Sequence, residues 1–271
     1  MTPLLEAIRI SVRAGEKWAC AALDLTIGRG EIWGILGING AGKTSLLHAL
    51  CGLRKIQSGE IKLNGIAMSG MKKRDIAQTL GMLFQDSEDH FPATVLETAL
   101  IGRHPHVEPW QWESSGDEKI ALEAIRAVGL SGLEKRLANT LSGGERRRLA
   151  LATLLVQDPE LYLLDEPTNH LDVGHQIGIL DLLESRTRKA GKSMVMVLHD
   201  PNLAERYCDR MLLLFDDGGA LSGARAEMLN ESNLSRLYRY PISSVEGPCG
   251  RLFFPARGQT APASALMTGC L

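Results

Sequence analysis

A glycine-rich stretch with the sequence GINGAGKT starts at Gly37 and ends at Thr44. Gly37, Gly40 and Gly42 allow backbone turns that a Cβ would forbid, so successive N–H groups can point toward one anion. Lys43 can reach the β- and γ-phosphates of a nucleotide, and the Thr44 hydroxyl can ligate Mg²⁺. An apolar run precedes this stretch and a helical pattern follows it, and that order predicts a nucleotide-binding P-loop.

Two neighbouring acids, Asp165 and Glu166, end an apolar run that begins at Leu161. A buried parallel strand delivers its last side chains to the sheet edge where ligands bind. Asp165 can hold Mg²⁺ there, directly or through water. Glu166 can polarise a water molecule that attacks a γ-phosphate. The alternative is that both acids cap the following turn, and the P-loop elsewhere in the chain disfavours it.

The sequence LSGGE, from Leu141 to Glu145, opens another helical pattern. Ser142 and two glycines stand at its amino end, where N–H groups and the helix dipole favour an anion. A plain helix cap also explains the serine and the glutamate. It does not explain Gly143 and Gly144, since consecutive glycines raise the entropic cost of starting a helix.

The elements that must position these residues alternate between strand and helix patterns. Residues 5–27 indicate an antiparallel β region that leads into the P-loop strand. Later strands alternate with helices, which predicts an α/β fold with a mostly parallel sheet and helices on both faces. The expected strands are 32–36, 60–63, 81–84, 161–164, 194–198 and 211–215, and the expected helices are 45–50, 74–80, 94–101, 117–128, 145–156, 175–188, 201–208 and pieces of 226–238.

One domain is expected over residues 1–245, with a helical subdomain at about 86–157 inserted in the α/β core. Beyond Val245 the composition turns to Gly, Pro, Ala, Ser and Thr. Such a segment cannot bury much apolar surface, so residues 246–271 are expected to be a poorly ordered tail.

The overall composition excludes several classes of protein. The 271 residues carry a formal charge of -2, so no basic excess indicates nucleic acid. No apolar run approaches the roughly 20 residues of a spanning helix, and the start lacks a signal-peptide pattern. The 5 cysteines form no CxxC pair, which favours free thiols in a reducing cytoplasm.

Taken together, these motifs resemble the ATPase subunit of an ABC transporter. LSGGE is similar to that family's signature motif, the glycine-rich stretch to its Walker A, and the strand ending at Glu166 to its Walker B. Gln85 falls at the Q-loop glutamine, Asp172 ends the NHLD of the D-loop, and His199 matches the switch histidine. Trp18 stands where the family has an aromatic residue that stacks on adenine.

The resemblance implies that the protein binds ATP and Mg²⁺ and is an active ATPase. Two copies, or paired ATPase subunits, would face head to tail with each ATP between them. Glu166 would activate water, His199 would steady the γ-phosphate, and Gln85 would sense the metal beside Thr44 and Asp165. The implied nucleotide-binding residues are Trp18, Gly37, Asn39, Gly40, Ala41, Gly42, Lys43, Thr44, Ser45, Ser142, Gly143, Gly144 and Asp172.

The departures from the family pattern are small. Ile38 follows the first glycine, where proline is common, and Arg146 to Arg148 stand where the family often has glutamine. Trp18 replaces the usual tyrosine and offers a larger π face. None of these changes removes a group that the chemistry needs.

The kind of ABC protein follows from what the chain lacks and from smaller matches. It has no coiled coil, no second head and no spanning helices of its own, which favours a stand-alone importer subunit over a non-transport ABC ATPase that serves assembly or regulation. Three segments resemble the corresponding segments of ATPase subunits that serve importers of ferric siderophores, haem and cobalamin. They are the stretch from Thr94 to GRHPH at residues 102–106, NHLD with His175, and HDPNLA from His199. Direct metal binding by His104 and His106 is a weaker alternative.

An importer subunit implies partners. A membrane permease is expected to dock on the surface from Asp86 to Trp112, with Phe91, Val107 and Trp110 at the contact. A periplasmic or surface solute-binding protein would deliver the solute to that permease. The expected location is the cytoplasmic face of the cell membrane, as a peripheral subunit.

Overall fold

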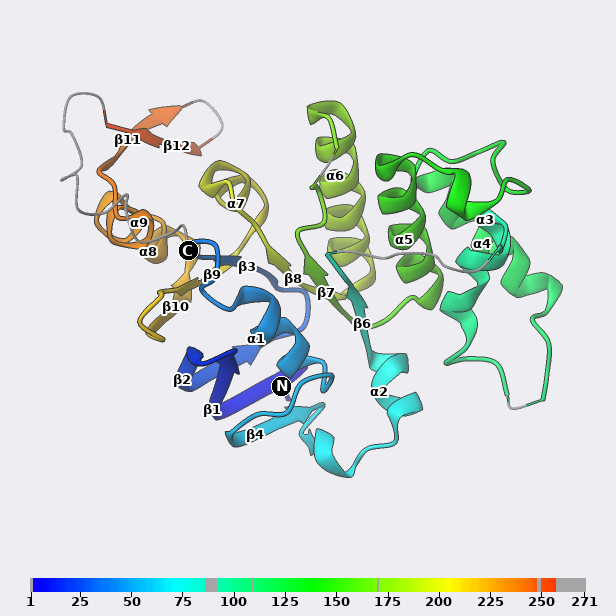
Figure 1. Cartoon of the computed structure of the whole chain (residues 1–271), viewed down its shortest axis with the longest axis horizontal. Coiled ribbons are helices and arrows are strands. Elements are labelled where there is room, and N and C mark those ends of the chain that lie inside the picture. The colour runs from blue at the N-terminus through cyan, green and yellow to red at the C-terminus, as the bar shows by residue number, and fades with distance from the viewer. Residues whose placement is uncertain (1, 86–91, 109, 170, 248–249, 257–271) are drawn as a thin grey trace.

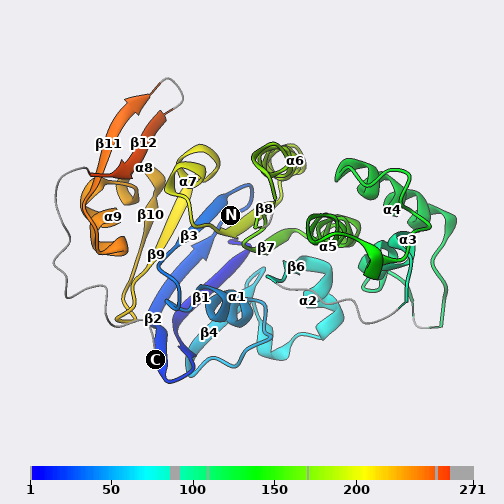
Figure 2. The same ribbon diagram turned by 45° about the horizontal axis from the view of Figure 1, so that its top comes forward.

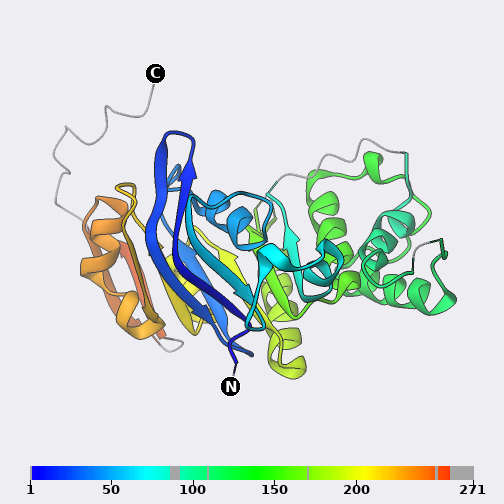
Figure 3. The same ribbon diagram turned by 90° about the horizontal axis from the view of Figure 1, so that it is seen from below.

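The computed structural model describes residues 2–85, 92–108, 110–169, 171–247 and 250–256. Two sheets occupy the middle of an elongated molecule (Figure 1). Seen from below, the helices of residues 95–157 and the C-terminal elements lie at opposite ends, with the sheets between them (Figure 3). No described helix is long and apolar enough to cross a membrane.

The central sheet has the strand order β10–β9–β3–β8–β7–β6. Strand β3, which precedes the glycine-rich turn, lies between β8 and β9 and runs parallel to both. Only the edge strand β10 is antiparallel to its neighbour. Every residue of β3, β7 and β8 is buried, which explains their continuous apolar runs and confirms the predicted parallel sheet. The strands are β3 Ile32–Leu36, β6 Leu80–Leu83, β7 Leu161–Asp165, β8 Ser193–Val197, β9 Arg210–Leu214 and β10 Ala220–Ala224.

A second, antiparallel sheet covers the other side of helix α1 (Lys43–Leu50), as the sequence predicts. Leu46, Leu47 and Leu50 of this helix are fully buried in a core that both sheets share. The helix that follows the P-loop is therefore clamped between two layers. The strands of the antiparallel sheet are β1 Leu5–Ala14, β2 Lys17–Ile27, β4 Ser58–Leu63 and β5 Ile66–Ala67.

The opposite face of the central sheet packs against helices in a second core. The helical subdomain at one end is built on three helices, each started by a capping box in which a Ser or Thr and an acid satisfy N–H groups reciprocally. The helices and short 3₁₀ turns are α2 Lys73–Thr79, α3 Val95–Leu100, α4 Ser115–Ala127, α5 Gly143–Gln157, α6 Val173–Ala190, α7 Pro201–Tyr207, α8 Arg225–Met228, α9 Glu231–Tyr238, η1 Met68–Gly70, η2 Ile101–Arg103 and η3 Ala138–Thr140.

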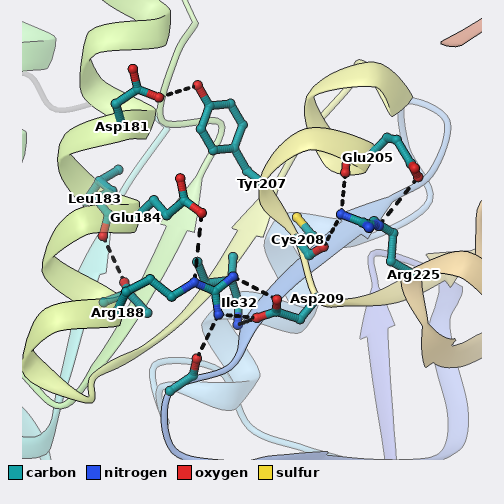
Figure 4. A network of polar contacts seen from close by, with 12 residues as sticks. Ile32, Asp181, Leu183, Glu184, Arg188, Glu205, Tyr207, Cys208, Asp209 and Arg225 are labelled. Carbon is teal, nitrogen blue, oxygen red and sulfur yellow. Dashed lines mark hydrogen bonds and ion pairs between the residues drawn. The ribbon is translucent and has the colours of Figure 1, made fainter. Parts of the chain in front are cut away.

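A polar network fixes the amino end of β3 (Figure 4). Arg188 of α6 donates two hydrogen bonds to Asp209, at 2.7 and 2.8 Å. The Asp209 carboxylate also accepts the Ile32 N–H at 2.9 Å. Tyr207 donates to Asp181 at 2.7 Å, which joins α7 to α6. The strand that carries the P-loop is thus anchored at its starting end through Asp209, which is itself paired with Arg188.

The C-terminal region differs from the prediction. Strands β11 (Ile242–Gly247) and β12 (Gly250–Pro255) form an antiparallel hairpin beside α7 (Figures 1 and 2). Phe253 is buried, and the Asn202 side chain bonds both its N–H and its carbonyl. The expected poorly ordered tail is therefore wrong for residues 246–247 and 250–256, because one apolar side chain and two backbone bonds secure the hairpin. Residues 257–271 lie outside the described residues.

Candidate functional site

The glycine-rich turn begins directly after β3 and forms one wall of a cavity of about 420 Å³. Gly40 and Gly42 have φ angles of 80° and 91°, which favour glycine. A Cβ on Gly42 would also lie 2.8 Å from the Ala19 Cα, so the antiparallel sheet leaves no room for one. The cavity is lined by Ala14, Asn39, Gly40, Gly42, Lys43, Thr44, Ser45, Gln85 and Glu166.

Lys43 is buried beneath this turn. Its Nζ donates to the Gly37 carbonyl at 2.8 Å and to the Ile38 carbonyl at 3.1 Å. Burial lowers the pKa of Lys43, while the nearby Glu166 and Asp165 carboxylates oppose that shift. The ammonium group is thus held by the carbonyls of the glycine-rich turn at the cavity wall, where it can bind a polyphosphate.

Asp165 is fully buried at the carboxyl end of β7. Among the described residues, neither carboxylate oxygen accepts a hydrogen bond within normal distance. Burial raises the pKa of Asp165, and the neighbouring Thr44 hydroxyl opposes the shift. Buried carboxylate oxygens without donors, beside a hydroxyl and a cradle for phosphates, fit a hard cation such as Mg²⁺.

Glu166 follows in the left-handed region, with a φ of 50°. Its carboxylate contacts three donors at once. Gln85 Nε2 lies 3.2 Å from Oε2, the Asn169 amide bonds the same oxygen, and His199 Nε2 lies 2.5 Å from Oε1. The structure thus brings together Gln85, Glu166 and His199 from the ends of three strands, β6, β7 and β8.

Other predicted residues lie outside this cavity. Ser142 accepts the Glu145 N–H at 3.3 Å as the cap of α5, so the capping interpretation is correct for its side chain. Gly143 and Gly144 form the first turn of that helix. Asp172 caps α6, and hydrogen bonds from the His175 backbone and ring lower its pKa.

Trp18 and Ala41 lie at the margin of the glycine-rich turn. Ala41 is buried, and its N–H bonds the Ile38 carbonyl at 3.2 Å. Trp18 is 38% exposed, and the Arg13 guanidinium lies 4.7 Å from its ring centroid. The indole is thus partly exposed, with the Arg13 guanidinium over its ring.

The GRHPH stretch serves the packing of the helical subdomain. Gly102 approaches α5 so closely that a Cβ would lie 2.9 Å from the Gln157 N. Arg103 pairs with Asp117 at 2.7 Å, and His106 bonds the Gln157 carbonyl at 2.8 Å. The Nε2 atom of His104 lies 3.8 Å from the Glu113 carboxylate. The described residues contain no group of three or more His, Cys, Asp or Glu that could hold a metal ion, so direct metal binding by this loop has no support.

Comparison with known proteins decides the family. The family model described as ABC transporter matches residues 20–169. This chain belongs to the ABC transporter ATPases. Its activity is accordingly ATP hydrolysis.

Related ABC proteins match most of the chain. The hemin import ATP-binding protein of Myxococcus xanthus is 38% identical over 90% of this chain and 93% of that protein. The achromobactin transport ATP-binding protein of Dickeya dadantii is 37% identical over 83% and 84%. A chain of an inward-facing metal-chelate type ABC transporter has a TM-score of 0.81 at 26% identity, covering 94% of this chain and 98% of that chain. Dimeric cassettes are also similar, including one bound to ADP and phosphate, with a TM-score of 0.71 at 27% identity.

Two residues outside the predicted site contact it in the structure. The Asn169 side-chain amide donates a hydrogen bond to the Glu166 carboxylate. The Arg147 guanidinium donates to the backbone carbonyls of Gln85 and Glu166. Arg147 stands between Arg146 and Arg148, so nothing in the sequence distinguishes it from its two neighbours. The match at His170 lies outside the described residues.

Proposed function

We propose that this chain powers the import of a metal-chelate solute through a separate membrane permease. The observation that carries the proposal is the similarity, over most of both chains, to ATP-binding proteins named for siderophore and hemin import. The candidate solutes are a ferric siderophore, haem or cobalamin. A solute-binding protein outside the membrane would deliver the solute, and the chain would sit on the cytoplasmic face.

The proposed chemistry uses the groups around the P-loop cavity. Lys43 and the N–H groups of the turn bind the β- and γ-phosphates. Glu166 takes the proton of the attacking water, while His199 holds the γ-phosphate in place. Mg²⁺, when bound, neutralises charge on the phosphate oxygens. Asp165 and Thr44, with Gln85 near them, are the residues that would hold it.

A second copy would complete the site. Ser142, Gly143 and Gly144 lie at the amino end of α5, outside the P-loop cavity of their own chain. Two ATPase domains facing head to tail would bring these residues against the nucleotide of the partner, together with Asp172. Trp18 would stack on the adenine.

A groove beside Gln85 is a suitable place for the permease. A hollow of about 220 Å³ lies between β6, α3 and α5, and it is lined by Met82, Leu83, Phe84, Thr98, Ile101, Ala150, Thr153, Leu154 and Gln157. Phe84 and Ile101 are 42% and 50% exposed at its rim. Val107 and Trp110 lie on the neighbouring loop, and Trp110 is fully exposed. Phe91 and Asp86 lie outside the described residues.

Transport in reconstituted vesicles tests the proposal. The chain would be combined with its permease and solute-binding protein, and a ferric siderophore, haem and cobalamin would be offered in turn. ATP-dependent uptake of one solute that disappears in Glu166→Gln is expected. Robust ATP hydrolysis without uptake of any of the three would contradict the proposed role.

A matched pair of substitutions tests the docking groove. Ile101→Asp should uncouple hydrolysis from uptake, because a carboxylate in an apolar contact is costly to desolvate. The control is Ile66→Asp, since Ile66 is 59% exposed on the antiparallel sheet, away from the groove. If uptake and coupling survive Ile101→Asp, the permease does not dock there.

A further inference from the structure

Arg147 is a buried charge in the helix that begins with the signature motif. It lies in α5, and only 7% of it is exposed. The arginine on its amino side, Arg146, instead reaches back to the Leu141 carbonyl at 2.9 Å. A buried guanidinium must find acceptors for its N–H groups, since an unsatisfied charge is among the costliest groups to bury.

The acceptors are backbone carbonyls on two neighbouring strands. Nη1 donates to the carbonyls of Phe84 and Gln85, at the end of β6, with the second contact at 3.1 Å. Nη2 donates to the carbonyls of Asp165 and Glu166, at the end of β7, with the second contact at 2.7 Å. One planar group thus holds four carbonyls at the point where the two strands leave the sheet.

Three of these four carbonyls belong to Gln85, Asp165 and Glu166, the residues proposed above to act on the γ-phosphate and its metal. Glu166 has a left-handed φ, which a residue with a Cβ adopts only when its surroundings hold it. The contact to its carbonyl fixes the peptide from which the carboxylate projects. The contact to the Gln85 backbone carbonyl fixes the backbone of that residue. The side-chain amide of Gln85 in turn donates to the Glu166 carboxylate at 3.2 Å.

We propose that Arg147 is a positioning residue for catalysis, which holds the backbones of Gln85 and Glu166 in register with the signature helix. The inference rests on the proposed roles of these two side chains. Because Arg147 lies in the second turn of α5, a shift of the signature helix moves both backbones together. The helix that faces the partner's nucleotide is therefore joined mechanically to the water-activating glutamate of its own chain.

The planar fork is what this role requires. A guanidinium presents several N–H groups in one plane, and here they spread over two strand ends. A lysine ammonium keeps the charge but cannot span both strands at once. A methionine keeps most of the volume and removes every donor.

The test compares Arg147→Met, Arg147→Lys and Arg147→Gln in the full-length chain by steady-state ATP hydrolysis and fluorescent-nucleotide binding. Loss of about one ångström of alignment costs roughly 100-fold in rate. We expect kcat to fall about 10- to 100-fold in Arg147→Met, with Arg147→Lys and Arg147→Gln between that value and wild type. Nucleotide affinity should stay within about threefold, because the P-loop is untouched. Arg146→Met is the control and should hydrolyse ATP as wild type does.

Chemical rescue separates positioning from folding. In Arg147→Ala, added guanidinium ion at a non-denaturing concentration should restore part of kcat, whereas ammonium ion at the same concentration should not. Glu166→Gln in the same assay reports on the proposed function itself. Loss of turnover in Glu166→Gln with a normal kcat in Arg147→Met would overturn the positioning role alone. A fall in nucleotide affinity that matches the fall in kcat, without rescue, would also overturn it.

Discussion

The two ends of the central sheet carry polar side chains in opposite states. At the amino end, Asp209 accepts hydrogen bonds from the Ile32 N–H and from both terminal nitrogens of Arg188. At the carboxyl end, Asp165 is more deeply buried, yet neither of its oxygens accepts a hydrogen bond within normal distance from a described residue, with the Thr44 hydroxyl as the neighbouring polar group. The same residue type thus stabilises the fold at one end and retains free binding capacity at the other.

This difference follows from where parallel strands deliver their residues. Loops at the carboxyl ends bring the P-loop, Gln85, Glu166 and His199 to one edge, while the other edge meets only short turns. Ser193 at the amino edge stabilises one of these turns, since its hydroxyl accepts the Gly30 N–H and donates to the Gly28 carbonyl. Changes at the amino end should therefore alter stability, and changes at the carboxyl end should alter ATP turnover.

The largest expected effect comes from Glu166→Gln. Removing the group that accepts the proton of water should slow hydrolysis about 10²- to 10⁴-fold, while ATP still binds and an ATP-bound dimer accumulates. Single-turnover hydrolysis and size-exclusion chromatography measure both. Glu160→Gln is the control, since Glu160 precedes the same strand at its other end and pairs with Arg29 at 2.6 Å on the surface. Full turnover in Glu166→Gln would mean that another group activates the water.

Asp165→Asn should act on binding and on stability in opposite directions. Affinity for ATP in the presence of Mg²⁺ should fall about 10- to 100-fold, because the amide supplies a weaker ligand for the cation. Without nucleotide, the variant should be more stable by about 1–3 kcal/mol, since a desolvated carboxylate without donors is removed. Calorimetry of binding and denaturant unfolding give the two values.

The raised pKa of Asp165 determines how the free energy of unfolding changes with pH. The folded protein binds this proton more tightly than the unfolded chain, so the stability linked to it is full below the unfolded pKa and declines as pH rises through the folded pKa. The stability difference between Asp165→Asn and wild type should therefore shrink as pH is lowered from neutral toward the ordinary range of aspartate. A difference that is constant with pH would exclude a buried, destabilised carboxylate.

Trp18→Ala should weaken ATP binding about tenfold, as expected when a base loses an aromatic stacking partner. Trp18 lies against Gly218, in the turn that follows β9 at the carboxyl end of the sheet. Trp18→Tyr should restore most of the affinity measured with fluorescent ATP analogues. Trp112→Ala removes an equally large side chain that is 90% exposed elsewhere, and it should leave affinity unchanged. Equal affinities for wild type and Trp18→Ala would remove the indole from the adenine site.

The smallest effect on turnover is expected at the amino end. Asp209→Asn should lower the free energy of unfolding by about 1–2 kcal/mol, because the substitution removes the ion pair with Arg188. The loss stays modest because this pair is partly exposed to solvent. ATP affinity and kcat should stay within about twofold of wild type. Denaturant unfolding and ATP hydrolysis on the same preparation measure both. A large loss of turnover would break the distinction between the two ends.

Much of this architecture could be predicted from the sequence, because it depends on local patterns. The buried strands appear as continuous apolar runs, and β8 at residues 193–197 lies one position from the predicted 194–198. The P-loop, the two acids at the carboxyl end of β7 and the switch histidine are recognisable because family spacing fixes their order. Their convergence in space follows from the rule that ligands bind at the carboxyl ends of parallel strands.

The missed features depend on partners that have no sequence pattern. Arg147 bonds backbone carbonyls 62 and 63 positions before it and 18 and 19 after it, and any residue supplies a carbonyl. The tail predicted for residues 246–271 includes strand β12, because Gly, Pro, Ala, Ser and Thr are frequent beyond Val245. Its attachment through Asn202 to the Phe253 backbone depends on a contact across 51 residues.

The close approach of Ala19 to Gly42 makes the P-loop less portable than its short motif implies. The loop keeps its shape only where a small residue of a separate, antiparallel sheet lies against it. Grafting GINGAGKT onto another strand and helix would not reproduce this cradle without residues 17–27 beside it. For the same reason, enlarging Ala19 should damage nucleotide binding from a position that no motif search would mark.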